Sequence, residues 1–406
     1  MRRCGEEMCH SDLSYVLGSQ DIRRLSAGIR SSELLPGPRY LEIHVTDRCN
    51  SRCYFCNQDW VKAQAREFSL DTFRQVVGRL TDNGLRAVRF SGGGDPTVHP
   101  DILKMLQIIH RSGLVLARFD TNGIRLTPEL SKRLLACGLE VLHISLQAPT
   151  PESWAKVTQR RPADFHTVIE NIRAFKQLDK TQRTSVYATF ALDEPTFDKL
   201  EQMILLCQDL DIDYTIHELN CYTYSDRFLL ECLPKLKNQL ERLLATESPE
   251  RGRLAEMRNA FFRRRRGGAG KLRRPADQAR KGKDNPGSET WANVAEQPCL
   301  APWTSVLIRP SGNVYLCCAL AAPKHILGNI FEQDIMEIWK GNALERVRQE
   351  AKALYFPGLS LRAGDDAGGR YRYLVPRCGS DCPVKVGMLG GPRSMVAQMT
   401  KALAES

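Results

Sequence analysis

Between Tyr40 and about Leu219, short apolar runs alternate with segments in which apolar side chains recur every three or four positions. Such runs favour strands, and the longer segments have the period of amphipathic helices. The expected strands are residues 40–46, 86–91, 115–120, 140–146, 185–192 and 213–219. The expected helices are residues 70–80, 102–110, 128–137, 165–178 and 197–210. Because parallel strands need a crossover helix, this predicts a parallel α/β sheet, either open or a partial barrel.

The pattern changes after this region and divides the chain further. Residues 263–290 are rich in Gly, Pro and charge and have few large apolar side chains, which predicts a disordered linker. Two short apolar runs, 306–308 and 314–316, flank a Pro-Ser-Gly-Asn turn and predict a hairpin. The expected units are an N-terminal extension 1–37, a core 38–240, a helical connection 241–262, the linker 263–290, a C-terminal domain 296–385 and a C-terminal helix 386–406.

Composition and charge narrow the function classes. Hydrophobic residues make up 42% of the chain, as in globular proteins, and no apolar run is long enough to span a membrane. The first residues lack the apolar core of a secretory signal, so a cytoplasmic location is expected. The net charge of +11 suggests nucleic-acid binding, but ten basic against two acidic residues place +8 of it in residues 263–284. That segment has no interleaved aromatic residues for base stacking, so a solvated linker is favoured over an RNA-binding element.

The 14 cysteines are the strongest chemical feature of the sequence. Cys49, Cys53 and Cys56 follow the first expected strand with the spacing C-x3-C-x2-C. Three thiolates are one short of the four that saturate a [4Fe–4S] cluster or a structural zinc ion, so one metal position would stay open for a substrate or cofactor. A zinc site with a remote fourth ligand is the alternative. The glycine run Gly92-Gly93-Gly94 follows the second expected strand, where backbone can approach a ligand closely.

Four motifs together resemble the radical S-adenosylmethionine (SAM) superfamily. They are CNSRCYFC (49–56), SGGGDP (91–96), DTNG (120–123) and HISLQA (143–148), and the resemblance covers roughly residues 38–240. It implies a partial (β/α)6 TIM-like barrel in which Cys49, Cys53 and Cys56 hold a [4Fe–4S] cluster that binds SAM. It also implies SAM contacts through Gly92, Gly93, Gly94, Asp95, Asn122 and Ser145. Asp95 stands where the family often has Glu, and Gln147 departs from the acidic residue frequent near its position.

Four more cysteines form a second set with the pattern Cys299-x12-Gly312-x4-Cys317 and, later, Cys378-x3-Cys382. Four thiolates saturate a closed [4Fe–4S] cluster, whereas a zinc ribbon prefers two C-x2-C pairs. Packing of these cysteines as small hydrophobic residues is the other alternative. The stretch resembles the SPASM/twitch domain of radical SAM enzymes, which implies one auxiliary [4Fe–4S] cluster. The Gly-x4-Cys register favours Cys317 over the adjacent Cys318.

The resemblance implies a radical SAM oxidoreductase. In that family reductive cleavage of SAM yields a 5′-deoxyadenosyl radical that removes hydrogen from an unreactive C–H bond. The preferred hypothesis is oxidation of a small molecule, such as a sugar or aminocyclitol, with the auxiliary cluster as electron acceptor. About 38 residues precede the barrel, fewer than a peptide-recognition domain of roughly 90 residues needs, which tilts the prediction away from peptides.

Three alternative functions stay open at this stage. One is peptide modification, and another is an RNA-modifying radical SAM enzyme that uses the basic linker. The third is radical epimerisation, in which Cys221, just past the sixth strand, returns a hydrogen atom to the substrate; packing is the plainer role for this thiol. Glu218 is a candidate base for a radical intermediate. The expected partners are a small-molecule or peptide substrate and a reductant such as flavodoxin or ferredoxin, without a membrane or nucleic acid.

Overall fold

The computed structural model describes residues 34–56, 64–218, 300–318, 321 and 323–355, together with isolated residues at 24, 235, 238, 239, 241, 242 and 245. Predictions for the linker 263–290, the C-terminal helix 386–406 and most of the connection 241–262 therefore lie outside the described residues. In the described part of the chain, no helix combines the length and apolar character needed to cross a membrane.

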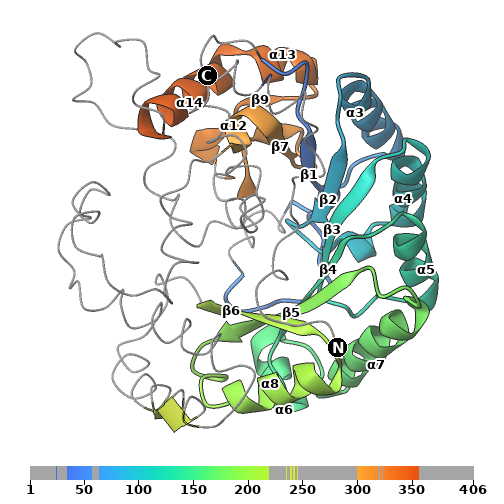
Figure 1. Cartoon of the computed structure of the whole chain (residues 1–406), viewed down its shortest axis with the longest axis vertical. Coiled ribbons are helices and arrows are strands. Elements are labelled where there is room, and N and C mark those ends of the chain that lie inside the picture. The colour runs from blue at the N-terminus through green and yellow to red at the C-terminus, as the bar shows by residue number, and fades with distance from the viewer. Residues whose placement is uncertain are drawn as a thin grey trace, which may run out of the picture.

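The six expected strands form one parallel sheet. They are β1 (Tyr40–His44), β2 (Ala87–Ser91), β3 (Val115–Thr121), β4 (Val141–Gln147), β5 (Ser185–Leu192) and β6 (Asp213–Glu218). Each strand pairs in parallel with the next along the chain. The sheet curves without closing in the described residues, with helices on its outer side, which confirms the predicted partial TIM-like barrel (Figure 1).

The crossover helices differ from the expectation at three places: one helix is additional, the helix expected from residue 165 begins three residues early at Pro162, and the last one begins late. They are α3 (Leu70–Asp82), α4 (Ile102–Arg111), α5 (Pro128–Ala136), α6 (Pro151–Thr158), α7 (Pro162–Leu178) and α8 (Leu200–Asp209). The sequence pattern missed α6 because Thr150-Pro151 looks like a turn, whereas Thr150 and Ser153 form a capping box and proline is favoured at a helix start. Helix α8 begins three residues late because the Thr196 hydroxyl accepts the Asp193 backbone N–H in a preceding turn.

The C-terminal residues extend this sheet. They form α12 (Ala301–Thr304), β7 (Ser305–Ile308), β8 (Asn313–Tyr315), β9 (Gly328–Asn329), α13 (Ile335–Lys340) and α14 (Asn342–Tyr355), with a 3₁₀ turn η6 (Pro323–His325). Strand β7 pairs in parallel with β1, and β8 returns antiparallel to it, so the predicted hairpin is present. The described sheet therefore has the order β6-β5-β4-β3-β2-β1-β7-β8-β9.

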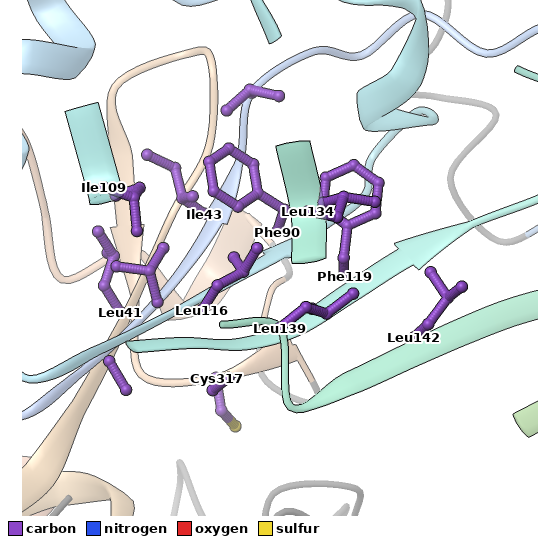
Figure 2. Close-up of a cluster of buried hydrophobic side chains, with 14 of the residues drawn as sticks. Leu41, Ile43, Phe90, Ile109, Leu116, Phe119, Leu134, Leu139, Leu142 and Cys317 are labelled. Atoms are coloured by element: carbon purple, nitrogen blue, oxygen red, sulfur yellow. The ribbon is translucent and has the colours of Figure 1, made fainter. Parts of the chain in front are cut away.

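The outer face of the barrel sheet is apolar and packs under the helices. Figure 2 shows Leu41, Phe90, Phe119 and Leu142 in one buried cluster with helix residues such as Ile109. These strand positions alternate with the positions that face the inner side, because successive side chains point to opposite faces of a strand. Burial of this face supplies the main driving force that holds the barrel together.

The C-terminal helices dock on the barrel through one buried aromatic side chain. Trp339 of α13 is fully buried, and its indole N–H donates to the Leu35 carbonyl at 3.1 Å. The Arg348 guanidinium lies over the Trp339 ring at 4.7 Å and donates to the Trp339 carbonyl at 2.8 Å. An ion pair between Arg79 of α3 and Asp334, 3.0 Å long, joins the same two regions.

Replacing Trp339 by Ala tests this docking. The substitution removes a fully buried aromatic side chain and the surface on which Arg348 stacks. It should therefore lower the free energy of unfolding by about 3–5 kcal/mol. Denaturant unfolding measures the change, with Phe331→Ala as the control, because Phe331 is 60% exposed and its loss should change stability by at most about 0.5 kcal/mol. Equal effects of the two substitutions would contradict the docking role.

Candidate active site

The cysteine loop, residues 47–56, leaves the carboxyl end of β1, and the glycine-rich loop after β2 lies against it. The Gly94 N–H donates to the Thr46 carbonyl at 3.0 Å, and the Asp95 N–H donates to the Arg48 carbonyl at 2.9 Å. Two loops separated by more than 40 residues are thus joined backbone to backbone at the carboxyl edge of the sheet. This edge is where parallel α/β sheets place their active sites.

Helix α6 holds the other side of the cysteine loop. Its C-terminal carbonyls of Val157 and Thr158 accept N–H bonds from Tyr54 and Arg52, at 3.2 Å and 3.0 Å. The Tyr54 hydroxyl also donates to the Asp193 carboxylate just past β5. Helix α6, which the sequence pattern missed, therefore holds the cysteine loop from one side, and the glycine-rich loop holds it from the other.

The three cysteines of this loop offer a suitable donor set for an iron–sulfur cluster. Cys49, Cys53 and Cys56 are all partly exposed at the carboxyl edge of the sheet, and the Cys56 N–H donates to the Cys53 carbonyl at 3.0 Å in a tight turn. Among the residues that the structure describes, no three His, Cys, Asp or Glu side chains are grouped closely enough to hold a metal ion. Ligation by these thiols is therefore a proposal that rests on donor chemistry and loop position.

Gly92 and Gly94 are required by the packing of the chain on itself. A Cβ atom at Gly94 would lie 1.8 Å from the Arg48 carbonyl oxygen, and one at Gly92 would lie 1.7 Å from the Gly94 carbonyl oxygen. No side chain can be accommodated at such distances. Gly94 thus permits the close approach of the two loops, and Gly92 permits the tight turn of the glycine-rich loop on itself. Both are structural roles in addition to the predicted contact of Gly92, Gly93 and Gly94 with SAM.

The Asp95 carboxylate is committed to hydrogen bonds within the protein. Asp95 is buried and accepts from the Thr97 N–H at 2.9 Å, the Thr121 hydroxyl at 3.0 Å and the Asn122 N–H at 2.7 Å. Burial raises its pKa, and these donors oppose the rise. Asp95 thus caps the 3₁₀ turn η2 (Pro96–Val98) and fixes the end of β3, so it positions the site rather than presenting a vacant carboxylate to a ligand.

The remaining predicted residues lie at the same edge or outside the described residues. Ser145 is half-buried on β4 and shares its face of the strand with His143. Gln147, which ends β4, is buried and adopts a left-handed φ of 67°, an unfavourable conformation that concentrates at functional sites. Glu218 is the last residue of β6 and pairs in register with Leu192. Cys221, Cys299, Cys378 and Cys382 lie outside the described residues.

Cys317 is the described member of the second cysteine set. It lies just past β8 and is 5% exposed within the hydrophobic cluster. In Figure 2 its sulfur points away from the labelled leucine and phenylalanine side chains. Cys318 is more exposed, and its thiol interacts electrostatically with Arg89 and Arg309 on the inner side of the sheet. The choice between the two as cluster ligand stays a prediction.

A chain of charged side chains lines the inner face of the barrel. Arg89 on β2 donates to the Asp120 carboxylate at 2.7 Å and lies 3.6 Å from the Glu42 carboxylate. Arg118 on β3 also pairs with Asp120, at 2.6 Å. His143 on β4 bonds Asp120 at 2.5 Å. The strand register places these residues side by side across β1 to β4.

The charged chain continues to β5 through one aromatic and one hydroxyl side chain. The other ring nitrogen of His143 bonds the Thr189 hydroxyl. Tyr187 stacks on His143 with ring centroids 4.8 Å apart and carries the Arg118 guanidinium 5.1 Å above its ring. The inner face of five adjacent strands is therefore linked by polar contacts.

The ionisation of the two buried acids is set by this network. Burial alone would raise the pKa of Glu42, but Arg89, His44 and a 2.5 Å bond from Ser91 lower it from 4.5 to about 2. Burial also opposes ionisation of Asp120, but Arg118 and Arg89 hold its pKa well below the ordinary value. Both carboxylates are therefore ionised at neutral pH, and their charges are balanced by two arginines.

Asp47, at the start of the cysteine loop, has a different balance of forces. It is buried, and burial raises its pKa to about 6, with Arg309 and Arg66 opposing the rise. Arg309 follows β7 and is buried, and its guanidinium donates to the Ala321 carbonyl at 3.2 Å. The start of the cysteine loop therefore carries a buried acid that interacts with Arg309 at the C-terminal hairpin.

The sequence contained a signal for this charged interior that the strand pattern did not use. Strands covered on both faces normally read as continuous apolar runs. Here Glu42, Arg89, Asp120 and His143 each interrupt an apolar strand. Charged residues at such positions, on neighbouring strands of one sheet, indicate that the inner face is polar and holds something other than a packed hydrophobic core.

With this geometry in place, two family models match the chain. The radical SAM superfamily matches residues 43–207, and the iron–sulfur cluster-binding SPASM domain matches residues 299–358. The chain therefore belongs to the radical SAM superfamily and carries a C-terminal SPASM domain, as its motifs predict. Membership in this superfamily implies an enzyme with SAM and [4Fe–4S] clusters as cofactors.

Curated relatives and solved structures agree with this assignment. A GTP 3′,8-cyclase from Peptoclostridium acidaminophilum is 30% identical over 195 residues, which is 46% of this chain and 57% of the relative. A tungsten-containing aldehyde ferredoxin oxidoreductase cofactor-modifying protein from Pyrococcus furiosus is 23% identical over 177 residues, 43% of this chain and 49% of the relative. The chain thus spans about half the length of these curated relatives.

The solved structure of Streptococcus suis SuiB bound to S-adenosylmethionine aligns with a TM-score of 0.52 and 17% identity. The alignment covers 90% of this chain and 76% of SuiB. At this level of identity the match shows a common fold, which spans both the barrel and the C-terminal region.

Replacing Glu42 by Gln tests the charged interior. Because the pKa of Glu42 is lowered in the folded state, its ionised form stabilises the fold above pH 4.5, and this contribution is lost as the pH falls toward 2. The variant removes one of the two carboxylates that pair with Arg89. Its free energy of unfolding at pH 7 should therefore be about 3–5 kcal/mol lower than that of wild type. Urea unfolding at several pH values from 7 to 3 measures this free energy. The difference between the variant and wild type should become smaller as the pH falls.

The control for this test is Asp71→Asn, which breaks an exposed ion pair with Arg74. Asp71 is 80% exposed, so its loss should change stability by less than about 1 kcal/mol at any of these pH values. If Glu42→Gln lowers the free energy of unfolding as little as the control does, or by an amount that does not depend on pH, the proposed charge network is wrong.

Replacing Gly94 by Ala tests the contact between the two loops. The added methyl group forces the Arg48 carbonyl away, so the variant should lose the iron of the first cluster, roughly four atoms per chain, after anaerobic reconstitution. Gly78→Ala is the matched control, because nothing lies within 4 Å of that position on α3 and alanine favours a helix by about 1 kcal/mol. Full iron content in the Gly94 variant would refute the required close approach.

Proposed function

We propose that this enzyme uses a 5′-deoxyadenosyl radical to oxidise an unactivated C–H bond of a small polar substrate held inside the barrel. The parallel pairing of β7 with β1 is the observation that carries the proposal. Strand β1 leads directly into the cysteine loop, and β7 leads through the hairpin to Cys317. The two sets of candidate cluster ligands therefore follow strands of one sheet, β1 and β8, with only β7 between them.

The proposed roles of the chain's own residues follow from their positions. Cys49, Cys53 and Cys56 hold the cluster that binds SAM, and Cys317 belongs to the four-cysteine set of the auxiliary cluster. When bound, these groups supply the hydrogen-abstracting radical and an acceptor for the electron left on the substrate. Glu218, the last residue of β6 at the carboxyl end of the sheet, is the proposed base for the proton released in that oxidation.

The charged inner face supports a polar substrate. Glu42, Arg89, Asp120 and His143 hold one another in fixed positions, so their remaining hydrogen-bonding capacity is pre-organised. These fixed charges and dipoles favour hydroxylated or amino-substituted molecules over hydrocarbons as ligands of this face. A reductant such as flavodoxin or ferredoxin is the expected protein partner.

Two other substrate classes are suggested by the relatives. Several curated relatives are named GTP 3′,8-cyclase, which makes nucleotide cyclisation the second candidate. SuiB has also been solved with its precursor peptide SuiA, which keeps peptide modification as an alternative. Incubation with GTP and with candidate peptides under reducing, anaerobic conditions distinguishes these classes from oxidation of a sugar or aminocyclitol.

Three cysteine variants test the proposal. The reconstituted wild type should contain about eight irons per chain and release 5′-deoxyadenosine from SAM and dithionite. Cys53→Ala should lose about four irons and all 5′-deoxyadenosine formation, and Cys317→Ala should lose about four irons yet keep SAM cleavage. Cys137→Ala is the control, because this buried thiol donates to the Leu106 carbonyl away from both loops.

Iron analysis and chromatography of the reaction products give the readouts. Stoichiometric zinc in place of iron, or a fully loaded wild type that does not cleave SAM, would overturn the proposal. Loss of SAM cleavage in the Cys137 variant at normal iron content would contradict the assignment of the catalytic cysteines.

A further inference from the structure

Asn122 connects the turn after β3 to the cysteine loop. It is 8% exposed and lies between the carboxylate of Asp95 on one side and the cysteine loop on the other. Its side-chain nitrogen Nδ2 is 2.6 Å from Asn50 Oδ1 and 3.9 Å from Cys49 Sγ, residues 72 and 73 positions earlier in the sequence. A single amide therefore contacts both a polar residue and a thiol of this loop.

The orientation of this amide is fixed by chemistry. The Ile124 backbone N–H, which can only donate, points at the Asn122 side-chain oxygen at 3.0 Å. That contact places the NH2 group on the opposite side, toward Asn50 and Cys49. Both hydrogens of the NH2 group therefore face acceptors, and a flipped amide would lose the Ile124 bond and direct its oxygen at the sulfur.

The turn that carries Asn122 is clamped from two directions. Asp95 accepts the Asn122 backbone N–H at 2.7 Å. On the other side, Asn171 of α7 donates from its side chain to the carbonyls of Gly123 and Ile124, at 2.9 Å and 3.1 Å. The Asn122 side chain thus starts from a rigid backbone, and its position relative to Cys49 is set by the fold.

We infer that Asn122 is a positioning residue that holds Cys49 and raises the reduction potential of the cluster on the cysteine loop. Hydrogen bonds to ligand sulfur reduce its electron donation to iron and stabilise the reduced cluster. Cys49 Sγ also accepts the Ser51 N–H at 3.4 Å, so Asn122 supplies the second N–H directed at this atom. The inference rests on the proposed ligation by Cys49, Cys53 and Cys56.

This role differs from the SAM contact that the motif resemblance predicts for Asn122. Both ends of its amide are engaged by the chain itself, which favours an effect on the cluster over one on the cofactor. A residue that binds SAM would change the concentration of SAM needed for half-saturation. A residue that acts on Cys49 changes the potential measured without SAM.

Two substitutions isolate the contact in the full-length, reconstituted enzyme. Asn122→Asp and Asn122→Ser both keep an oxygen for the Ile124 N–H and both remove the N–H donors to the cysteine loop. Asp adds a negative charge near the thiolate, whereas Ser does not, so Ser separates the hydrogen bond from the charge. Asn171→Ala is the matched control, because it removes an asparagine next to the same turn but keeps the Asp95 bond to the Asn122 backbone and the Asn122 amide itself.

The readouts are iron per chain and the midpoint potential, from potentiometric titration of the EPR signal that changes when SAM is added. Without SAM, both Asn122 variants should show a potential more negative than wild type, with the larger shift in Asn122→Asp, and Asn171→Ala should match wild type. Selective loss of about four irons from the Asn122 variants, with iron retained in the Asn171 variant, would equally support the positioning role.

The inference would be overturned if both Asn122 variants had the midpoint potential of wild type. It would also be overturned if Asn171→Ala showed the same shift in potential, or the same loss of iron, as the Asn122 variants. If Asn122→Asp does not fold, Asn122→Ser alone decides between these outcomes. Iron content that is unchanged in Cys53→Ala would instead show that the proposed ligation fails, and this result is independent of the Asn122 variants.

Discussion

The contact between the glycine-rich loop and the cysteine loop is the constraint on which the site depends. The Arg48 carbonyl occupies the space where any side chain at Gly94 would project. This contact lets two backbone segments share hydrogen bonds at the carboxyl edge of β1 and β2. The same edge receives the Asp95 bonds to Thr121 and Asn122, so the ends of three strands are tied together in one rigid unit.

The outer face of the sheet is apolar, whereas the inner face is charged. The outer face is buried under helices and stabilises the barrel through the hydrophobic effect. The inner face holds two ionised carboxylates against two arginines, an arrangement that carries a desolvation penalty and adds little net stability. This fixed polar face is the basis of the proposal that a polar substrate binds inside the barrel.

The sequence predicted the features that are local along the chain. Six strands were visible because apolar runs and amphipathic segments alternate, and the three cysteines were visible because they lie within eight residues. Helix α6 was missed because Pro151 at a helix start resembles a turn. The pairing of Arg89 with Glu42 and Asp120 depends on strand register, and the approach of Asn122 to Cys49 depends on a side chain fixed by contacts about 50 to 70 residues away. Neither can be obtained from one sequence, because local patterns do not specify register or side-chain direction.

The pairing of β7 with β1 joins the C-terminal region to the barrel. It makes the SPASM hairpin a continuation of the barrel sheet, so the two candidate cluster sites are distinct in ligands yet joined by one element. The most direct measurement is EPR spectroscopy of the dithionite-reduced, fully reconstituted enzyme with and without SAM. The account predicts two cluster signals, of which SAM changes one and leaves the other unaltered. A spectrum that SAM does not change, in a protein with full iron content, would contradict an open SAM-binding cluster on the cysteine loop.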